Sequence, residues 1–362
     1  MIILANVAYI FSIFLIILVI YGYKFILQKL SNNVLKKESY CDITVLIPVY
    51  NGEYRIANKI KNVLDSDYPV NMMKVVVIDD GSTDNTSKIA EQYPVSLINT
   101  VKRVGKIGAL NQGIKKSNSD VIIITDSDVM TKKNSFKELV AYFSDEKVAG
   151  VVGNVQMAFY PQWFAFGESR FLKNENTLRY LESRADSVSC MDGRLCAFRK
   201  SVIPAINNSS AADDVELPFQ IRKSGHRVVF AKEAEVYEEP TCLWRSWFTQ
   251  KRGRSARGIS VTLRHMDFLF NPKYGLFGFF IFPVRRIIFA LVPFFLIYVF
   301  IYTIWLWPSV IMAVGVLVAL LLLRLKNRSL FLYIILLNTA LILSWLDLAA
   351  GKINKGAKWE NY

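Results

Sequence analysis

Long uncharged stretches lie near both ends of the chain. Residues 1–23 carry no charge, residues 287–323 form a second uncharged run, and a mostly apolar stretch follows over 329–346. About 20 apolar residues cross a bilayer core of about 30 Å. We therefore predict an N-terminal membrane span at 1–28 and about three C-terminal spans within 287–350, followed by a tail at 351–362. The first run lacks a basic start and a small-residue cleavage site, which favours an anchor over a signal peptide.

Basic residues border these stretches and predict their orientation. Cationic loops favour the cytoplasmic side, so the segment between the first and second stretches is expected in the cytoplasm and the protein in the cell membrane. Three C-terminal spans would put the C-terminus outside, whereas late lysines favour the inside, and the sequence leaves this open. The bordering residues are Lys24, Lys29, Lys36, Lys37, Arg285, Arg286, Arg324, Lys326 and Arg328, and the late ones are Lys352, Lys355 and Lys358.

Between the spans, β-branched apolar runs alternate with helical patterns. The runs cover 43–48, 74–78, 95–99 and 121–125, and the helical patterns cover 56–64, 85–92 and 110–116. This alternation predicts an α/β domain with a mostly parallel sheet over 40–240. Such sheets bind ligands at the carboxyl ends of their strands. Four carboxylates fall there: Asp79, Asp80, Asp126 and Asp128.

The spacing of Asp126 and Asp128 suits a divalent cation. Two carboxylates in one turn, together with substrate phosphates, are a common way to hold Mg²⁺ or Mn²⁺. A solvated acidic loop would give the same pattern in isolation. The second acidic pair, after a parallel strand, favours the metal interpretation.

Two further segments carry candidate chemistry. Residues 102–111 combine three basic residues with two glycines before a helix. Such a segment is able to bind phosphate through backbone amides and a Lys ammonium, but an ordinary basic loop before a helix would give the same pattern. Asp213 and Asp214 begin another helical pattern, where acids also act as simple caps. Residues 241–286 predict interfacial amphipathic helices: nine Lys and Arg and one acid lie between 245 and 286.

Composition then excludes several classes. The chain is 52% apolar with a net charge of +14 and a mean hydropathy of +0.27, which excludes a disordered protein. Its basic residues gather at span borders, so we predict membrane contact and no nucleic-acid binding. No zinc or Ser-His-Asp hydrolase site is predicted, because no CxxC or GxSxG motif occurs around Cys41, Cys190, Cys196, Cys242, His226 or His265.

The motifs, and their order along the chain, resemble those of a known protein family. They are Ile47-Pro48-Val49-Tyr50-Asn51, Asp79-Asp80-Gly81-Ser82, Gly105-Lys106 with Leu110-Asn111, Asp126-Ser127-Asp128, Asp213-Asp214, and Gln250 to Arg254. Over about 43–346 the chain is similar to membrane-integrated family 2 glycosyltransferases of the hyaluronan, cellulose and poly-N-acetylglucosamine synthase kind. The resemblance implies a GT-A-like fold and transfer of a sugar from a nucleotide sugar, with UDP expected over GDP, to a growing polysaccharide.

The resemblance also implies a role for each residue. Asp214 would be the general base, and Asp128 with Asp126 would hold Mg²⁺ or Mn²⁺. The nucleotide sugar would contact Tyr50, Glu53, Asp79, Asp80, Lys106, Asp126, Gln250, Arg252 and Arg254, and the acceptor would contact Asp213, Gly193 and Arg194. The expected partners are the donor, a glycan or lipid-linked acceptor and the bilayer, and the sequence names no partner protein.

The last two motifs depart from the family pattern. The triplet Thr-Glu-Asp reads Ala212-Asp213-Asp214, and the Gln-x-x-Arg-Trp site reads Gln250-Lys-Arg-Gly-Arg254, with no Trp. Two activities therefore stay open: processive synthesis with export through the spans, or addition of one sugar to a polyprenyl-linked lipid or glycolipid. Trp163, Phe164 and Phe166 suit either a core or a sugar platform.

Overall fold

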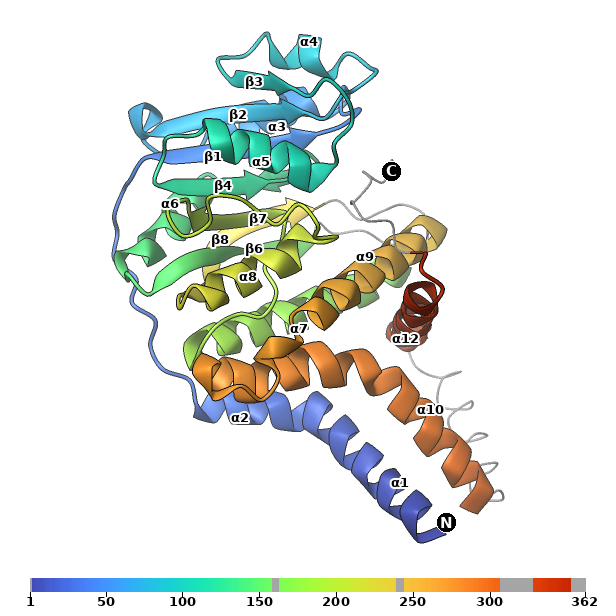
Figure 1. Cartoon of the computed structure of the whole chain (residues 1–362). Coiled ribbons are helices and arrows are strands. Elements are labelled where there is room, and N and C mark those ends of the chain that lie inside the picture. Colours follow the sequence, from blue (N-terminus) through green and yellow to red (C-terminus); the bar gives the residue numbers. More distant parts are fainter. Residues whose placement is uncertain (1, 158–162, 239–243, 307–327, 353–362) are drawn as a thin grey trace.

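The computed structural model describes residues 2–157, 163–238, 244–306 and 328–352, and its centre is one eight-stranded sheet (Figure 1). The sheet order is β3-β2-β1-β4-β7-β6-β8-β5. The strands are β1 Ile43–Val49, β2 Met73–Asp79, β3 Ser96–Asn99, β4 Val121–Thr125, β5 Val129–Thr131, β6 Val148–Met157, β7 Leu195–Arg199 and β8 Arg227–Glu238. All four predicted strands are present.

The sheet is mixed but mostly parallel, as expected: among the described strands, β7 and β5 run opposite to the other six. The predicted strands form a parallel half, with β1 between β2 and β4, and β3 beside β2. Beyond β4, β7 runs antiparallel to both β4 and β6, so β6 returns to the direction of β4, and the edge strand β5 runs antiparallel to β8. Among the described residues, only β6 with β8 adds a parallel pair in this second half.

Helices cover both faces of the parallel half. Every residue of β1 is buried, which explains its unbroken apolar run. Alternate side chains of β1 face α3 (Ile56–Leu64) or α5 (Lys106–Lys116): Val45 packs in one core with Ile60, and Leu46 packs in the other with Leu110. The remaining helices of this domain are α4 Thr86–Ala90, α6 Ser135–Val140, α7 Trp163–Ala185 and α8 Asp213–Lys223.

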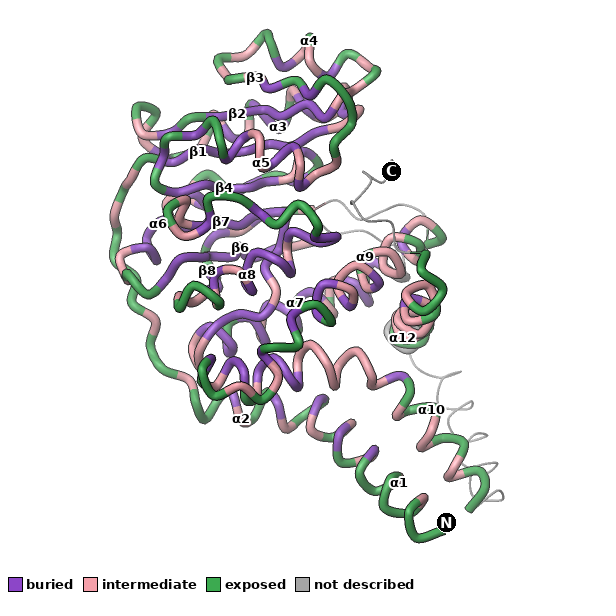
Figure 2. The backbone as a smooth tube through the Cα atoms, in the orientation of Figure 1, coloured by how far each residue is buried: buried purple, intermediate pink, exposed green. Residues whose placement is uncertain are grey.

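Two long apolar helices extend from the domain side by side (Figure 1). They are α1 (Ile2–Ile17), which continues into α2 (Tyr23–Lys29), and α10 (Phe289–Leu306). The hydroxyl of Tyr298 on α10 donates to the carbonyl of Ala5 at 2.9 Å. Their outer surfaces are apolar and exposed (Figure 2), with Ile3 80% and Leu4 75% exposed. Such surfaces are suited to lipid.

Three helices in the described part of the chain are long and apolar enough to cross a membrane: Ile2–Lys29, Phe277–Leu306 and Leu332–Ala349. The predicted middle C-terminal span falls on 307–327, outside the described residues. The second helix begins at Phe277, ten residues before the predicted border, so Arg285 lies inside it. This is tolerated because Arg285 forms ion pairs with Glu182 (3.1 Å) and Glu175 of α7.

The last helix differs in direction from the other two. In Figure 1, α12 (Arg328–Ala349) is seen nearly end-on, whereas α1 and α10 are seen lengthwise. It packs beside α9 (Trp244–Arg264). The guanidinium of Arg252 on α9 donates twice to the carboxylate of Asp347, at 2.6 Å each. The C-terminal end of α12 is thus tied to a helix that directly follows the sheet.

The segment predicted as interfacial helices buries part of its apolar surface within the protein. After α9, the short turns at Met266–Phe268 and Pro272–Tyr274 lead into the second candidate span. Phe268 is fully buried against Phe219 of α8. Among the described residues of this segment, five large apolar side chains stay exposed and are free to meet a lipid surface: Trp244, Leu263, Met266, Phe270 and Phe279.

Candidate active site

The acidic pair after β2 shapes the loops around it. The carboxylate of Asp79 accepts a hydrogen bond from the amide of Ser82 (2.8 Å) and one from the hydroxyl of Ser87. The carboxylate of Asp80 accepts from the amides of Val104 and Gly105, at 2.8 Å each. Both carboxylates therefore hold backbone amides in place, a bracing role that the sequence did not indicate.

The motif after β1 meets the same loops. The guanidinium of Arg103 lies over the ring of Tyr50, 4.0 Å from its centroid. The carboxylate of Glu53 accepts from the amide and the side chain of Asn85, both at 3.1 Å. Tyr50 and Asp80 thus border one loop cluster at the carboxyl ends of β1 and β2, as predicted, while Glu53 braces it.

The turn between β4 and β5 carries the two predicted metal ligands. Asp128 is the more open carboxylate: its side chain is 52% exposed, and its nearest cation is the guanidinium of Arg55 at 3.9 Å. Asp126 is more enclosed. Burial raises the pKa of Asp126 to about 6, the nearby ammonium of Lys106 opposes this shift, and the charge of Asp128 adds to it.

One lysine joins this turn to the second acidic segment. The Nζ of Lys106, at the start of α5, lies 2.8 Å from Oδ1 of Asp126 and 3.3 Å from Oδ2 of Asp213. Burial would lower the pKa of Lys106, but the carboxylates of Asp126 and Asp213 outweigh it and raise the pKa. Lys106 is therefore charged in this structure and holds together segments 87 positions apart in the sequence.

Asp214 follows on the first turn of α8. It is half-buried, and burial is the main cause of its raised pKa, with the charges of Asp213 and Asp192 adding to it. The cations of Lys106 and Arg254 act in the opposite direction. Asp214 is thus a carboxylate with increased proton affinity beside two cations, which is the environment that a general base needs.

The residues predicted for the acceptor lie beside Lys106. Gly193 is in direct contact with it, since a Cβ at this position would come 2.8 Å from Nζ of Lys106. Arg194 instead belongs to a buried ion-pair cluster. Its guanidinium donates to Asp192 at 2.7 and 2.8 Å and also pairs with Glu238. These bonds hold the backbone of Gly193 against the lysine.

Only part of the Gln250–Arg254 motif faces this cluster. On a helix, residues four apart share a face and residues two apart do not. Gln250 and Arg254 of α9 therefore share one face, and Arg254 is close enough to influence Asp214. Arg252 points elsewhere and binds Asp347. The structure thus brings Arg254 to the site and directs Arg252 away from it.

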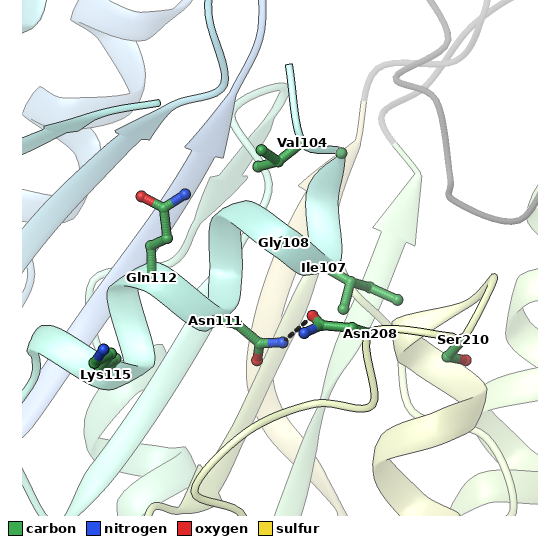
Figure 3. Close-up of a pocket in the computed structure, with 9 residues that line it drawn as sticks. Val104, Ile107, Gly108, Asn111, Gln112, Lys115, Asn208 and Ser210 are labelled. Carbon is green, nitrogen blue, oxygen red and sulfur yellow. Dashed lines mark hydrogen bonds between the residues drawn. The ribbon is translucent and has the colours of Figure 1, made fainter. Parts of the chain in front are cut away.

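A cavity of about 440 Å³ adjoins the cluster along α5 (Figure 3). One end lies at Val104 and Gly105, immediately before Lys106, and the far side is the loop that precedes α8. The side-chain amide of Asn111 donates to Oδ1 of Asn208 at 2.6 Å and so links α5 to the loop before α8. The predicted motif residue Asn111 therefore has a structural contact here. The lining residues are Val104, Gly105, Ile107, Gly108, Asn111, Gln112, Lys115, Asn208 and Ser210.

Sequence reasoning missed a group of buried charges. Lys59 of α3 is fully buried beneath the Asp126–Asp128 turn. Glu168, Glu175 and Glu182 are also buried and stand seven residues apart along α7. This spacing is visible in the sequence and would have identified one face of the helix.

Of the three aromatic residues predicted as core or sugar platform, Phe166 is 42% exposed and lies beneath the guanidinium of Arg170. The side chains of Trp163 and Phe164 lie outside the described residues.

Comparison with sequence families now identifies the domain. Residues 44–206, which hold the β1, β2 and β4 motifs and Gly193, match the family described as glycosyl transferase family 2. The chain carries a glycosyl transferase family 2 domain. The predicted resemblance and the predicted enzyme class, a glycosyltransferase, are thereby confirmed for these residues.

Curated relatives match a longer part of the chain than the family model does. The probable glycosyltransferase YdaM of Bacillus subtilis is 28% identical over 275 residues, covering 71% of this chain and 62% of the relative. The poly-beta-1,6-N-acetyl-D-glucosamine synthase of Staphylococcus aureus is 26% identical over 265 residues, covering 68% of this chain and 61% of the relative. The chain thus spans about three fifths of the length of these relatives.

A solved structure extends the likeness beyond the family 2 domain. The mannosyltransferase PcManGT of Pyrobaculum calidifontis, in complex with GDP-Man and Mn²⁺, superimposes with a TM-score of 0.74 at 20% identity. The match covers 95% of this chain and 99% of that one. The predicted GT-A-like α/β fold is confirmed, and the likeness includes the helices outside the family 2 domain.

Proposed function

We propose that the protein is a membrane-bound inverting glycosyltransferase that transfers a sugar from a nucleotide sugar, expected to be a UDP-sugar, to a growing polysaccharide. One observation carries the proposal. The ammonium of Lys106 bridges Asp126 of the Asp126–Asp128 turn and Asp213 of α8. This brings the candidate cation ligands, which lie inside the family 2 domain, and the candidate base, Asp214, which follows that domain in the sequence, to one end of the parallel strands.

The donor would bind across the loops after β1, β2 and β4. Tyr50 and Asp80 border the space proposed for the base and ribose, with Glu53 and Asp79 bracing its walls. Lys106 and Arg254 supply positive charge for the diphosphate. Charge that develops on a leaving diphosphate is stabilised by such preplaced cations, so these two residues favour breakage of the bond to the sugar.

The residues present fit a divalent cation. Asp128 has an open carboxylate and Asp126 a neighbouring one, and among the described residues no third His, Cys, Asp or Glu joins them. That oxygen-only set matches Mg²⁺ or Mn²⁺ held by one or two carboxylates and substrate phosphates. Asp128 would be the principal ligand. When bound, the ion would supply Lewis-acid stabilisation of the diphosphate.

Asp214 would take the proton from the attacking acceptor hydroxyl. A sugar hydroxyl is a weak nucleophile, so a carboxylate must remove its proton during the attack on the anomeric carbon. Attack from the face opposite the diphosphate inverts that carbon. Asp213 and Gly193 adjoin Lys106 on the side of α8, which is where we propose that the acceptor enters, while Arg194 acts by holding Gly193 in place.

The acceptor distinguishes two versions of this function. The synthase named among the relatives favours a growing polysaccharide. The missing Trp after Arg254 and the likeness in fold to a mannosyltransferase favour addition of one sugar to a polyprenyl-linked lipid or glycolipid. Both versions use the same donor site, cation and base, so the product decides between them.

The experiment is a donor panel followed by sizing of the product. Purified membranes containing the protein are incubated with radiolabelled UDP- and GDP-sugars and Mg²⁺ or Mn²⁺, and released nucleotide is measured. We expect release from one UDP-sugar, with N-acetylglucosamine and glucose as first candidates. A ladder or high polymer supports the synthase, and one sugar on an organic-extractable lipid supports the alternative. Release from none of the donors contradicts the proposal.

We also propose that the C-terminus lies on the cytoplasmic side with the catalytic domain. Asp347 near the end of α12 binds Arg252 of α9, and α9 directly follows the sheet domain. The direction of α12, across α1 and α10, favours a helix at the membrane interface over a full crossing (Figure 1). This choice agrees with the late lysines.

Reporter fusions test this orientation. Green fluorescent protein fused after Tyr362 is expected to fluoresce, and alkaline phosphatase at the same point is expected to be inactive, because the phosphatase folds only outside the cytoplasm. Phosphatase fused before Met1 provides the opposite control, since the N-terminus is expected outside. An active phosphatase after Tyr362 would contradict the proposal and assign α12 as a full span.

A further inference from the structure

A buried lysine lies directly behind the candidate cation site. Lys59 is on α3, and its side chain is 0% exposed. Its Nζ donates to the hydroxyl of Thr125 and to the carbonyl of Val129, both at 2.8 Å. Thr125 is the residue before Asp126, and Val129 is the residue after Asp128. One ammonium therefore binds both ends of the turn that carries the two carboxylates.

The same hydroxyl continues the chain of hydrogen bonds. While Thr125 accepts from Lys59, its Oγ1 donates to the carbonyl of Arg194 at 3.0 Å. The neighbouring Gly193 packs against Nζ of Lys106. Lys59 thus fixes the Asp126–Asp128 turn relative to the loop that positions Lys106, and it does so from the opposite side of the site.

Burying an ammonium is costly, which makes its location informative. Desolvation lowers the pKa of Lys59 to about 7, and the charges of Asp126 and Asp128 oppose the shift. An apolar side chain would fill the same space without this cost. Lys59 therefore does two things: its ammonium donates hydrogen bonds to Thr125 and Val129, and its positive charge partly balances the negative charges of Asp126 and Asp128.

We propose that Lys59 is a positioning residue for the cation and donor site: by binding Thr125 and Val129, it holds Asp126 and Asp128 in the geometry that binds a divalent cation. This inference rests on the proposed function. Lys59 does not itself contact the carboxylates in this structure, and it is expected to touch neither the cation nor the donor. Its loss should therefore weaken cation binding more than it weakens the fold.

The test is Mn²⁺ binding in the presence of UDP, measured by electron paramagnetic resonance of free Mn²⁺ on the purified full-length protein. Lys59→Met keeps the length and apolar stem but removes the donors, and we expect at least a tenfold weaker Mn²⁺ affinity. Lys61→Met, an exposed lysine on the same helix, is the matched control and should match wild type. Melting temperature is measured in parallel.

A second variant covers the case in which Lys59→Met fails to fold. Thr125→Val removes the shared hydroxyl and is expected to weaken Mn²⁺ affinity severalfold, whereas Thr125→Ser, which keeps the hydroxyl, should restore it. Affinities within twofold of wild type in Lys59→Met, or in Thr125→Val if that is the variant that folds, overturn the role of Lys59. Wild-type protein that binds no Mn²⁺ with UDP would instead overturn the proposed cation site on which this inference rests.

Discussion

Replacing Asp214 with Asn is expected to lower the rate of sugar transfer about a thousandfold, within the range that a general base contributes. Asn cannot take the proton of the acceptor hydroxyl, but it keeps the shape of the side chain at the start of α8. The bridge from Lys106 to Asp126 and Asp213 does not involve Asp214, so donor binding should stay close to wild type. Transfer is measured with the donor identified by the panel, and UDP affinity by calorimetry.

Two controls make this prediction specific. Asp267→Asn removes an exposed carboxylate on a turn after α9, paired with Lys223, and is expected to leave transfer unchanged. The pH profile adds a second test. A base must be deprotonated, and the pKa of Asp214 is raised by burial and by Asp213 and Asp192, so transfer should decline with falling pH earlier than an ordinary carboxylate would require. Transfer within tenfold of wild type in Asp214→Asn removes Asp214 from this role.

Replacing Asp128 with Asn is expected to lower nucleotide release by a factor of about a hundred to a thousand, the usual effect of removing one electrostatic contact to a developing charge. The open carboxylate of Asp128 is the better placed of the two candidate ligands, because Asp126 is already paired with Lys106. A chelator should abolish release in the wild type, and added Mn²⁺ or Mg²⁺ should restore it.

The matched control for this change lies at the other end of the same strand. Asp120 immediately precedes β4 and is exposed, so Asp120→Asn alters the charge near β4 without touching the turn and should behave as wild type. Half-saturating Mn²⁺ is measured for each variant. Release that persists in excess chelator, or an unchanged metal requirement in Asp128→Asn, would contradict the assignment of Asp128 as principal ligand.

The parallel half of the sheet was predictable because its signal is local. Strands buried on both faces read as unbroken β-branched runs, and β1 and β4 are of this kind. The reversal at β7 was not predictable in the same way. Strand direction is decided by which edges pair, and the partners of β7 lie far away in the sequence, on β4 and β6.

The candidate site also has some features that were predictable from short segments and others that were not. The spacing of Asp126 and Asp128, and the presence of acids after β2, are properties of short segments that the sequence displays directly. The hydrogen bonds of Asp80 to the amides of Val104 and Gly105 are not, since those amides come from a distant turn that only the fold places nearby. Arg252 shows the opposite effect: the motif suggested the diphosphate, and helix periodicity turned the side chain to Asp347.

By itself, the sequence determined the apolar helices at both ends, the alternating strands and helices between them, and the residue types for a cation, a diphosphate and a base. Only the tertiary structure decided which of these residues meet. Lys106 joins Asp126 to Asp213 across a large separation, and Lys59 reaches the cation turn from a helix with no motif. The reason is physical: hydrophobic pattern is encoded locally, whereas the pairing of buried charges depends on the whole packed fold.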